Sequence, residues 1–154
     1  MPDCRRASAL LIAALCVAGA TLSACGRKTQ VKPPEMVAPE PIDTLAATNA
    51  ATGVQLSWRR PAKYADGSRM TDLGAFQVER SSNGAPFMPV ATIEVTDRDR
   101  LQQARHFRWV DTDAVPGETY QYRVISLTTD GYASRPSNIA TIERETPTPA
   151  PEPH

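Results

Sequence analysis

The fold of this chain is decided by one stretch, Gly53-Val54-Gln55-Leu56-Ser57-Trp58. Its apolar side chains, on Val54, Leu56 and Trp58, occupy alternate positions, and successive side chains of a β-strand point to opposite faces. The three apolar residues therefore share one face of a predicted strand, and the polar residues between them share the other. A strand of this kind belongs to a sheet that buries one face and exposes the other to solvent.

The same two-residue period recurs on both sides of this stretch. The further segments are 45–47, 76–79, 87–93, 107–109, 120–124 and 139–142. Pro89 has no backbone N–H group, so the segment 87–93 is expected at a sheet edge or as an irregular strand. In the last segment either Ile139 with Thr141 or Ala140 with Ile142 can face the core, and the pattern leaves both choices open.

Turn signals separate these segments. They are Asp66-Gly67, Asn83-Gly84, Pro116-Gly117 and Asp130-Gly131. Asn-Gly and Asp-Gly pairs tolerate the positive φ of tight hairpins, so they favour reversals between neighbouring strands. A helical turn is an alternative at residues 98–103, but this stretch is polar and is expected to form a solvated loop. Seven short strands punctuated in this way predict an all-β fold, a seven-stranded antiparallel β-sandwich.

Four motifs occur along the chain in a fixed order. They are the stretch from Gly53 to Trp58 followed by Pro61, the run Phe76-Gln77-Val78-Glu79-Arg80-Ser81, the run from Asp111 to Val124 around Pro116-Gly117, and residues 131–138 with Pro136-Ser137-Asn138. Together they resemble the fibronectin type III family, whose sandwich is immunoglobulin-like, and the resemblance covers residues 41–144. It implies a single fibronectin type III-like domain, which we place at residues 43–144.

The resemblance also implies roles for individual residues. Trp58 would be a central packing residue, and Tyr120 would make the tyrosine-corner hydrogen bond to nearby backbone. Tyr122 and Trp109 are expected to lie in the core as well. One departure is Ala114, where the family usually has a leucine before Pro-Gly, and Val115 is expected to supply that packing.

The first 24 residues are interpreted as a signal peptide. Arg5 and Arg6 precede an apolar run from Ala9 to Ala20, and this run is too short to span about 30 Å of hydrocarbon, which needs roughly 20 apolar residues. The run leads to Leu22-Ser23-Ala24-Cys25, which resembles the lipobox of bacterial lipoproteins. The resemblance implies cleavage before Cys25 and lipidation of its thiol and new amino terminus, which adds palmitate or a similar acyl chain.

The residue after the cysteine is Gly26 and not Asp, and by resemblance this implies sorting to the outer membrane. We therefore expect a lipid anchor in the bacterial outer membrane, with the domain on the periplasmic face. Exposure at the cell surface is compatible with the same sequence.

Proline-rich segments flank the domain. Residues 25–42 are interpreted as the lipidated anchor and a linker, with Pro33, Pro34, Pro39 and Pro41 favouring extended backbone. Residues 145–154 contain four more prolines and are expected to form a disordered tail.

Composition excludes several classes of function. Lys plus Arg and Asp plus Glu number 17 each, so the balanced charge argues against a nucleic-acid partner and against electrostatic binding to anionic lipid. Of the three cysteines, Cys4 and Cys16 leave with the signal peptide and lipid consumes Cys25, so no disulfide is expected.

Candidate catalytic and metal-binding groups are sparse in the expected mature chain. Its histidines are His106, in a predicted strand and facing away from Phe107, and His154 at the last position. The aspartates at 97, 99, 111 and 113 do not have the spacing of a calcium loop. We therefore expect no enzyme activity, no cofactor and no metal site.

The expected function is that of a non-enzymatic, membrane-anchored lipoprotein whose fibronectin type III-like domain is displayed as a binding or spacer module. Tyr132 and Arg135, near the Asp130-Gly131 turn, form the candidate interaction loop, because loops on a rigid sandwich commonly bind partners. A second hypothesis is a glycan-binding accessory lipoprotein, for which Tyr132 and Tyr64 are the candidate exposed aromatic side chains. A third follows from Cys25-Gly26-Arg27-Lys28, which faintly resembles small lipoproteins that assist lipopolysaccharide-export assembly. The expected partners are the membrane, an envelope protein and, in the second hypothesis, a glycan.

Overall fold

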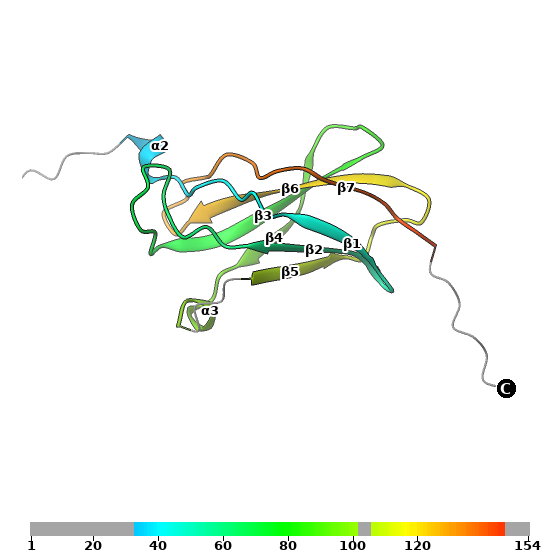
Figure 1. The fold of residues 1–154 in the computed structure, drawn as a ribbon, viewed down its shortest axis with the longest axis horizontal. Coiled ribbons are helices and arrows are strands. Elements are labelled where there is room, and N and C mark those ends of the chain that lie inside the picture. Colours follow the sequence, from blue (N-terminus) through cyan, green and yellow to red (C-terminus); the bar gives the residue numbers. More distant parts are fainter. Residues whose placement is uncertain (1–32, 102–105, 147–154) are drawn as a thin grey trace, which may run out of the picture. The chain divides into compact units, whose positions relative to one another are not determined.

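The computed structural model describes residues 33–101 and 106–146. Within them, seven strands form two antiparallel sheets (Figure 1). The strands are β1 (Ala46–Ala50), β2 (Gly53–Arg59), β3 (Leu73–Ser82), β4 (Met88–Glu94), β5 (His106–Asp111), β6 (Thr119–Thr128) and β7 (Ala140–Glu143). The prediction of an all-β, seven-stranded antiparallel sandwich is confirmed.

The strands are divided between a three-stranded and a four-stranded sheet. The first has the order β1-β2-β5, and the second has the order β4-β3-β6-β7. In the first sheet Trp58 lies opposite Phe107, and in the second Val78 lies opposite Val124. Because side chains alternate along each strand, these pairs put one apolar face of each sheet into the shared core.

An aromatic cluster joins the two sheets. The ring centroid of Trp58 lies 5.4 Å from that of Phe76, in an edge-to-face contact, and 6.3 Å from that of Phe107, in a stacked contact. The ring centroids of Phe76 and Phe107 are 4.7 Å apart. Phe76 comes from β3, whereas its two neighbours come from the opposite sheet. Trp58 exposes only 2% of its surface, so its predicted role as a central packing residue is confirmed.

Strand β4 lies at an edge of the four-stranded sheet, as its proline predicts. Its pairing with β3 shifts between Val78 and Glu79, where the register jumps from Ala91 to Pro89. Pro89 cannot donate to a neighbouring strand, and the irregularity twists the edge locally. The expectation of an edge or irregular strand at residues 87–93 is confirmed.

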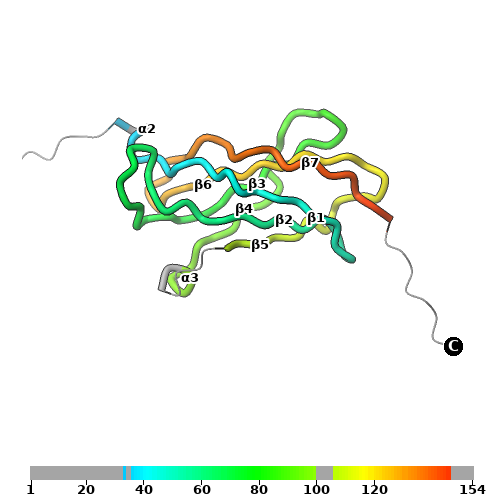
Figure 2. The backbone as a smooth tube through the Cα atoms, viewed as in Figure 1, coloured from blue at the N-terminus to red at the C-terminus, as the bar shows by residue number. Residues whose placement is uncertain are grey.

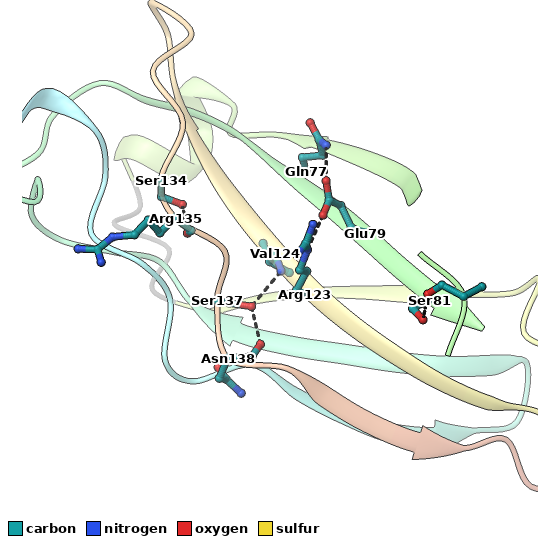
Figure 3. A network of polar contacts seen from close by, with 10 residues as sticks. Gln77, Glu79, Ser81, Arg123, Val124, Ser134, Arg135, Ser137 and Asn138 are labelled. Atoms are coloured by element: carbon teal, nitrogen blue, oxygen red, sulfur yellow. Dashed lines mark hydrogen bonds and ion pairs between the residues drawn. The ribbon is translucent and has the colours of Figure 1, made fainter. Parts of the chain in front are cut away.

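The chain between β6 and β7 runs beside β6, and two of its serine hydroxyls accept hydrogen bonds from backbone N–H groups of β6, as backbone carbonyls do in a regular sheet. The Oγ of Ser137 accepts from the backbone N–H of Val124 at 2.9 Å and donates to the carbonyl of Asn138 at 2.7 Å (Figure 3). Ser134 makes the matching pair, accepting from the N–H of Ser126 at 2.9 Å and donating to the carbonyl of Arg135 at 2.8 Å.

The structure shows which residues of the last predicted segment, 139–142, face the core. Ala140 is buried and Ile142 packs against the core, whereas Ile139 exposes 52% of its surface. Ala140 and Ile142 therefore form the inward pair.

The expectation of a solvated loop at residues 98–103 is wrong for its first residues, which form the short helix α3 (Asp97–Leu101). The cause is a capping box: the backbone N–H of Thr96 donates to Asp99 Oδ2 at 2.9 Å, and that of Asp99 donates to Thr96 Oγ1 at 3.3 Å. The Thr96 hydroxyl also donates to Asp99 Oδ2 at 2.6 Å, and this hydrogen bond, together with the one from the Thr96 N–H, lowers the pKa of Asp99. Residues 102–105 lie outside the described ranges.

The predicted linker over residues 25–42 ends earlier than expected. A short helix, α2 (Pro34–Val37), is followed by Pro39, which pairs with Tyr64 in an isolated β-bridge, and Ile42 is a buried member of the core. Proline in extended backbone can lie beside another segment, so its abundance does not by itself mark a linker. Residues 25–32 and most of the predicted tail, 147–154, lie outside the described ranges.

The Pro-Gly turn shows which residue replaces the usual leucine. Ala114 is buried, whereas Val115 exposes 57% of its surface, so the expectation that Val115 supplies the packing is wrong.

The hydroxyl of Tyr120 accepts a hydrogen bond from the backbone N–H of Val115 at 2.9 Å, so the predicted tyrosine corner is confirmed.

Replacing Tyr120 with phenylalanine is expected to lower the free energy of unfolding by about 1 kcal/mol, because the N–H of Val115 loses its acceptor while the ring stays in place. Urea denaturation followed by circular dichroism measures the change. Tyr132→Phe is the matched control, since no hydrogen bond of its hydroxyl occurs among the described residues, and it should leave stability unchanged. Equal stability of Tyr120→Phe and the parent would show that the corner hydrogen bond does not contribute.

Candidate interaction surfaces

The connection between β6 and β7 holds both predicted interaction residues on a fixed backbone. The N–H of Tyr132 donates to Thr128 Oγ1 at 2.9 Å, and the N–H of Thr128 donates to the Tyr132 carbonyl at 3.0 Å. The Tyr132 side chain is 40% exposed, and Arg135 is exposed, with a side chain that extends away from the serine contacts in Figure 3. Within the described ranges no hydrogen bond or ring contact joins the two side chains. They are therefore two separate contact points on one rigid loop.

This loop lies at the end of the sandwich where the chain from residue 33 joins it (Figure 2). The N–H of Thr129 donates to the carbonyl of Asp72 at 2.8 Å, and the N–H of Ala65 donates to the carbonyl of Ala38 at 2.9 Å. The β2–β3 connection thus contacts both the Tyr132 loop and the incoming chain. Cys25, the predicted lipidation site, lies outside the described residues, and no helix in residues 33–101 or 106–146 is long and apolar enough to cross a membrane.

Tyr64 is not the exposed aromatic platform that the glycan hypothesis expects. It is half-buried, packs against the core, and its hydroxyl donates to Asp72 Oδ1 at 2.6 Å. Burial and the Asp72 carboxylate raise the pKa of Tyr64. Its ring therefore braces the β2–β3 connection.

A buried polar cluster links the two sheets near the opposite end. Asp111 Oδ2 accepts from Arg80 at 2.8 Å and from the Tyr122 hydroxyl at 2.8 Å, and Oδ1 accepts from the N–H of Asp113 at 3.1 Å. Asp111 is 2% exposed and belongs to β5, whereas Arg80 and Tyr122 belong to β3 and β6. Burial and the Asp111 carboxylate strongly raise the pKa of Tyr122, so the hydroxyl stays protonated and donates. The cluster is a structural clamp between the sheets.

A second network covers the outer face of the four-stranded sheet. Arg123 Nε donates to Glu79 Oε2 at 2.5 Å, and Gln77 Nε2 donates to Glu79 Oε1 at 3.1 Å (Figure 3). The Arg123 guanidinium also lies over the Phe87 ring, 4.3 Å from its centroid. Glu79 is only 8% exposed although it faces outward, because these neighbours cover it.

Two of the aspartates at 97, 99, 111 and 113 make hydrogen bonds that hold the fold together. Asp111 belongs to the inter-sheet clamp and Asp99 caps α3. Within the described ranges no group of three His, Cys, Asp or Glu side chains could hold a metal ion. His106 is exposed and Phe107 is buried, so the predicted alternation in β5 is confirmed.

Comparisons with known proteins support the fold. No protein-family model matches the sequence, and the search of curated proteins finds no match. Among solved structures, the twitchin kinase region from C. elegans matches 70% of this chain at 19% identity with a TM-score of 0.51, and the match spans 17% of that longer chain. The third fibronectin III domain of the human KIAA0343 protein matches 83% of this chain and 100% of its own length at 9% identity, with a TM-score of 0.50. At these identities the likeness shows the fold alone, a fibronectin type III-like β-sandwich.

The surfaces could be predicted only in part from the sequence. The Tyr132 loop is recognisable from its turn signal, whereas the inter-sheet clamp is not. Arg80 and Asp111 are 31 residues apart, and only the pairing of strands within each sheet and the packing of the sheets bring them together.

Proposed function

We propose that this protein is a non-enzymatic lipoprotein of the bacterial outer membrane whose fibronectin type III-like sandwich is displayed as a binding or spacer module. The observation that carries the proposal is the motif Leu22-Ser23-Ala24-Cys25, placed between an apolar run and the folded domain. Two or three acyl chains on one cysteine hold a protein stably at a membrane, whereas a single chain holds it only marginally.

The use of the buried ionisable groups supports a non-enzymatic role. Asp111 pairs with Arg80, and Glu79 pairs with Arg123. Arg144 is buried, and its guanidinium donates to the Asn49 side chain at 3.2 Å and to the Ala51 carbonyl at 3.3 Å. Each of these groups joins strands or their connections, which is what a rigid display module needs.

The glycan-binding alternative has less support. Sugar-binding surfaces commonly use several exposed aromatic side chains, and here Tyr64 is braced against Asp72. Tyr132 then remains as the exposed aromatic residue of the candidate loop. A protein partner in the envelope therefore fits this loop better than a sugar chain.

Replacing Cys25 with alanine is expected to abolish lipidation and move the protein out of the membrane fraction. Mass spectrometry of the mature wild-type chain should find acyl groups on Cys25, and fractionation should place that chain with the outer membrane. Ser23→Ala is a matched control, because a small residue is retained before the cysteine and processing should continue. An unmodified Cys25 in the mature protein would refute the anchor and leave the fold unaffected.

A further inference from the structure

The outer face of the three-stranded sheet carries two arginines and a histidine, and no acidic side chain of its strands lies beside them. The inward positions of β2 are Val54, Leu56 and Trp58, so Arg59 points outward, and in β5 the same alternation turns His106 and Arg108 outward. Strands β1 and β2 contain no acidic residue, and the acid of β5, Asp111, points into the sandwich. We call the outer face of β1, β2 and β5 the cationic face.

The three side chains lie close together and have no protein partner in the described part of the chain. Arg59 is the direct cross-strand partner of His106, and Arg108 pairs with Ser57. Arg59 and Arg108 are therefore diagonal neighbours, at a Cβ separation of about 7 Å or somewhat less. All three residues are exposed, and among residues 33–101 and 106–146 no hydrogen bond or ion pair engages their side chains. Thr44 accepts from the backbone N–H of Arg59 at 3.0 Å, yet no ion pair joins the adjacent Asp43 to Arg59.

The opposite face of the sandwich has the opposite sign. The outer face of the four-stranded sheet carries Glu79, Glu94 and Glu143 against one cation, Arg123. A balanced overall charge therefore conceals a separation of charge between the two faces. Such a separation orients the sandwich at a charged surface, with one face attracted and the other repelled.

We propose that the cationic face docks on an anionic phospholipid surface, namely the membrane that holds Cys25, so the inference rests on the proposed lipid anchor. Seven residues, 26–32, separate Cys25 from Pro33. Even fully extended, a chain of this length reaches only about 30 Å, so the anchor holds the sandwich beside the lipid surface at a high effective concentration.

The shape and composition of the face suit lipid headgroups. Several of its outward residues, Ala46, Thr48 and Ser57, are shorter than the arginines, and Gln55 and Val110 complete the face without adding a charge. Guanidinium groups bind phosphate oxygens with two parallel hydrogen bonds. The aromatic residues of β2 and β5 point inward, which disfavours a sugar chain that would stack on this face.

The test uses the full-length lipidated protein in vesicles of phosphatidylcholine alone or of phosphatidylcholine with phosphatidylglycerol. A Ser57→Cys variant carries a fluorophore on the cationic face, and Thr92→Cys carries it on the outer face of the other sheet. Quenching by a lipid labelled at its headgroup reports contact. We expect strong quenching at position 57 only with phosphatidylglycerol, its loss at high salt, and little quenching at position 92.

Charge variants provide the matched comparison. Arg59→Glu with Arg108→Glu should reduce quenching at position 57 to the level seen at position 92. Lys63→Glu with Arg135→Glu makes the same change of charge outside the cationic face and should leave the quenching at position 57 strong.

Co-sedimentation with neutral vesicles tests the anchor separately. Protein that sediments with neutral vesicles but shows no quenching at position 57 on vesicles that contain phosphatidylglycerol overturns the docking and leaves the lipoprotein proposal standing. Protein that fails to sediment with neutral vesicles refutes the anchor itself. Quenching that the Arg59 and Arg108 variants do not change also overturns the docking.

Discussion

Replacing Trp58 with alanine is expected to lower the free energy of unfolding by about 3 to 5 kcal/mol. The side chain is 2% exposed and contacts Phe76 and Phe107 from both sheets, so its removal leaves a cavity where the sheets meet. For a domain of this size, a loss of that order lowers the melting temperature by roughly 15 to 30 °C. Urea and thermal denaturation followed by circular dichroism measure it.

Trp58→Phe is the informative control for this cavity. The indole Nε1 of Trp58 is buried without a hydrogen-bond partner in the described structure, so phenylalanine removes volume and an unsatisfied donor together. We therefore expect a loss clearly smaller than that of alanine. If Trp58→Ala cost less than about 1 kcal/mol, the aromatic cluster would not be the packing centre of the sandwich.

The strands with apolar alternation could be predicted from the sequence, because their buried positions are filled by apolar side chains. Strands β3 and β6 are longer than the predicted segments 76–79 and 120–124 because their ends place polar side chains inside. Arg80 faces inward to Asp111, and Ser126 is fully buried opposite Phe76. A polar residue at an inward position interrupts the hydrophobic pattern, so the pattern stops before the strand does.

Features that depend on distant pairs could not be predicted. The acidic neighbours of Asp111 in the sequence suggest a metal ligand, but its partners in the structure, Arg80 and Tyr122, come from two strands of the other sheet. The cationic face could not be predicted for the same reason. Arg59 and Arg108 are 49 residues apart in the sequence and become neighbours only through the β2–β5 pairing. Net charge averages over both faces and therefore hides it.

The Tyr132 loop and the cationic face lie on different parts of the sandwich, so they can contact different partners. The Tyr132 loop lies at the end where the chain joins the sandwich, whereas the cationic face runs along a sheet. If that sheet lies on the lipid, the outer face of the four-stranded sheet points away from the membrane. The Glu79–Arg123 network and the Phe87 ring would then be presented to envelope partners.

Replacing Asp111 with alanine is expected to lower the free energy of unfolding by about 3 kcal/mol. Removing one member of a buried ion pair costs about 3 to 5 kcal/mol, because the remaining charge loses its partner. We expect the lower end, since the Arg80 side chain retains 23% exposure and recovers some hydration. The Tyr122 hydroxyl, which is buried, loses its acceptor in the same variant.

Four further variants distinguish the inter-sheet clamp from a local effect. Asp111→Asn keeps an oxygen acceptor and should cost less than alanine, and Asp113→Ala, at an exposed neighbouring position, should change stability by no more than about 0.5 kcal/mol. Combining Asp111→Ala with Arg80→Met should cost less than the sum of the two single variants, because the second substitution removes the charge that the first leaves unpaired. Strict additivity in urea denaturation would mean that the 2.8 Å contact between Arg80 and Asp111 does not couple the two sheets.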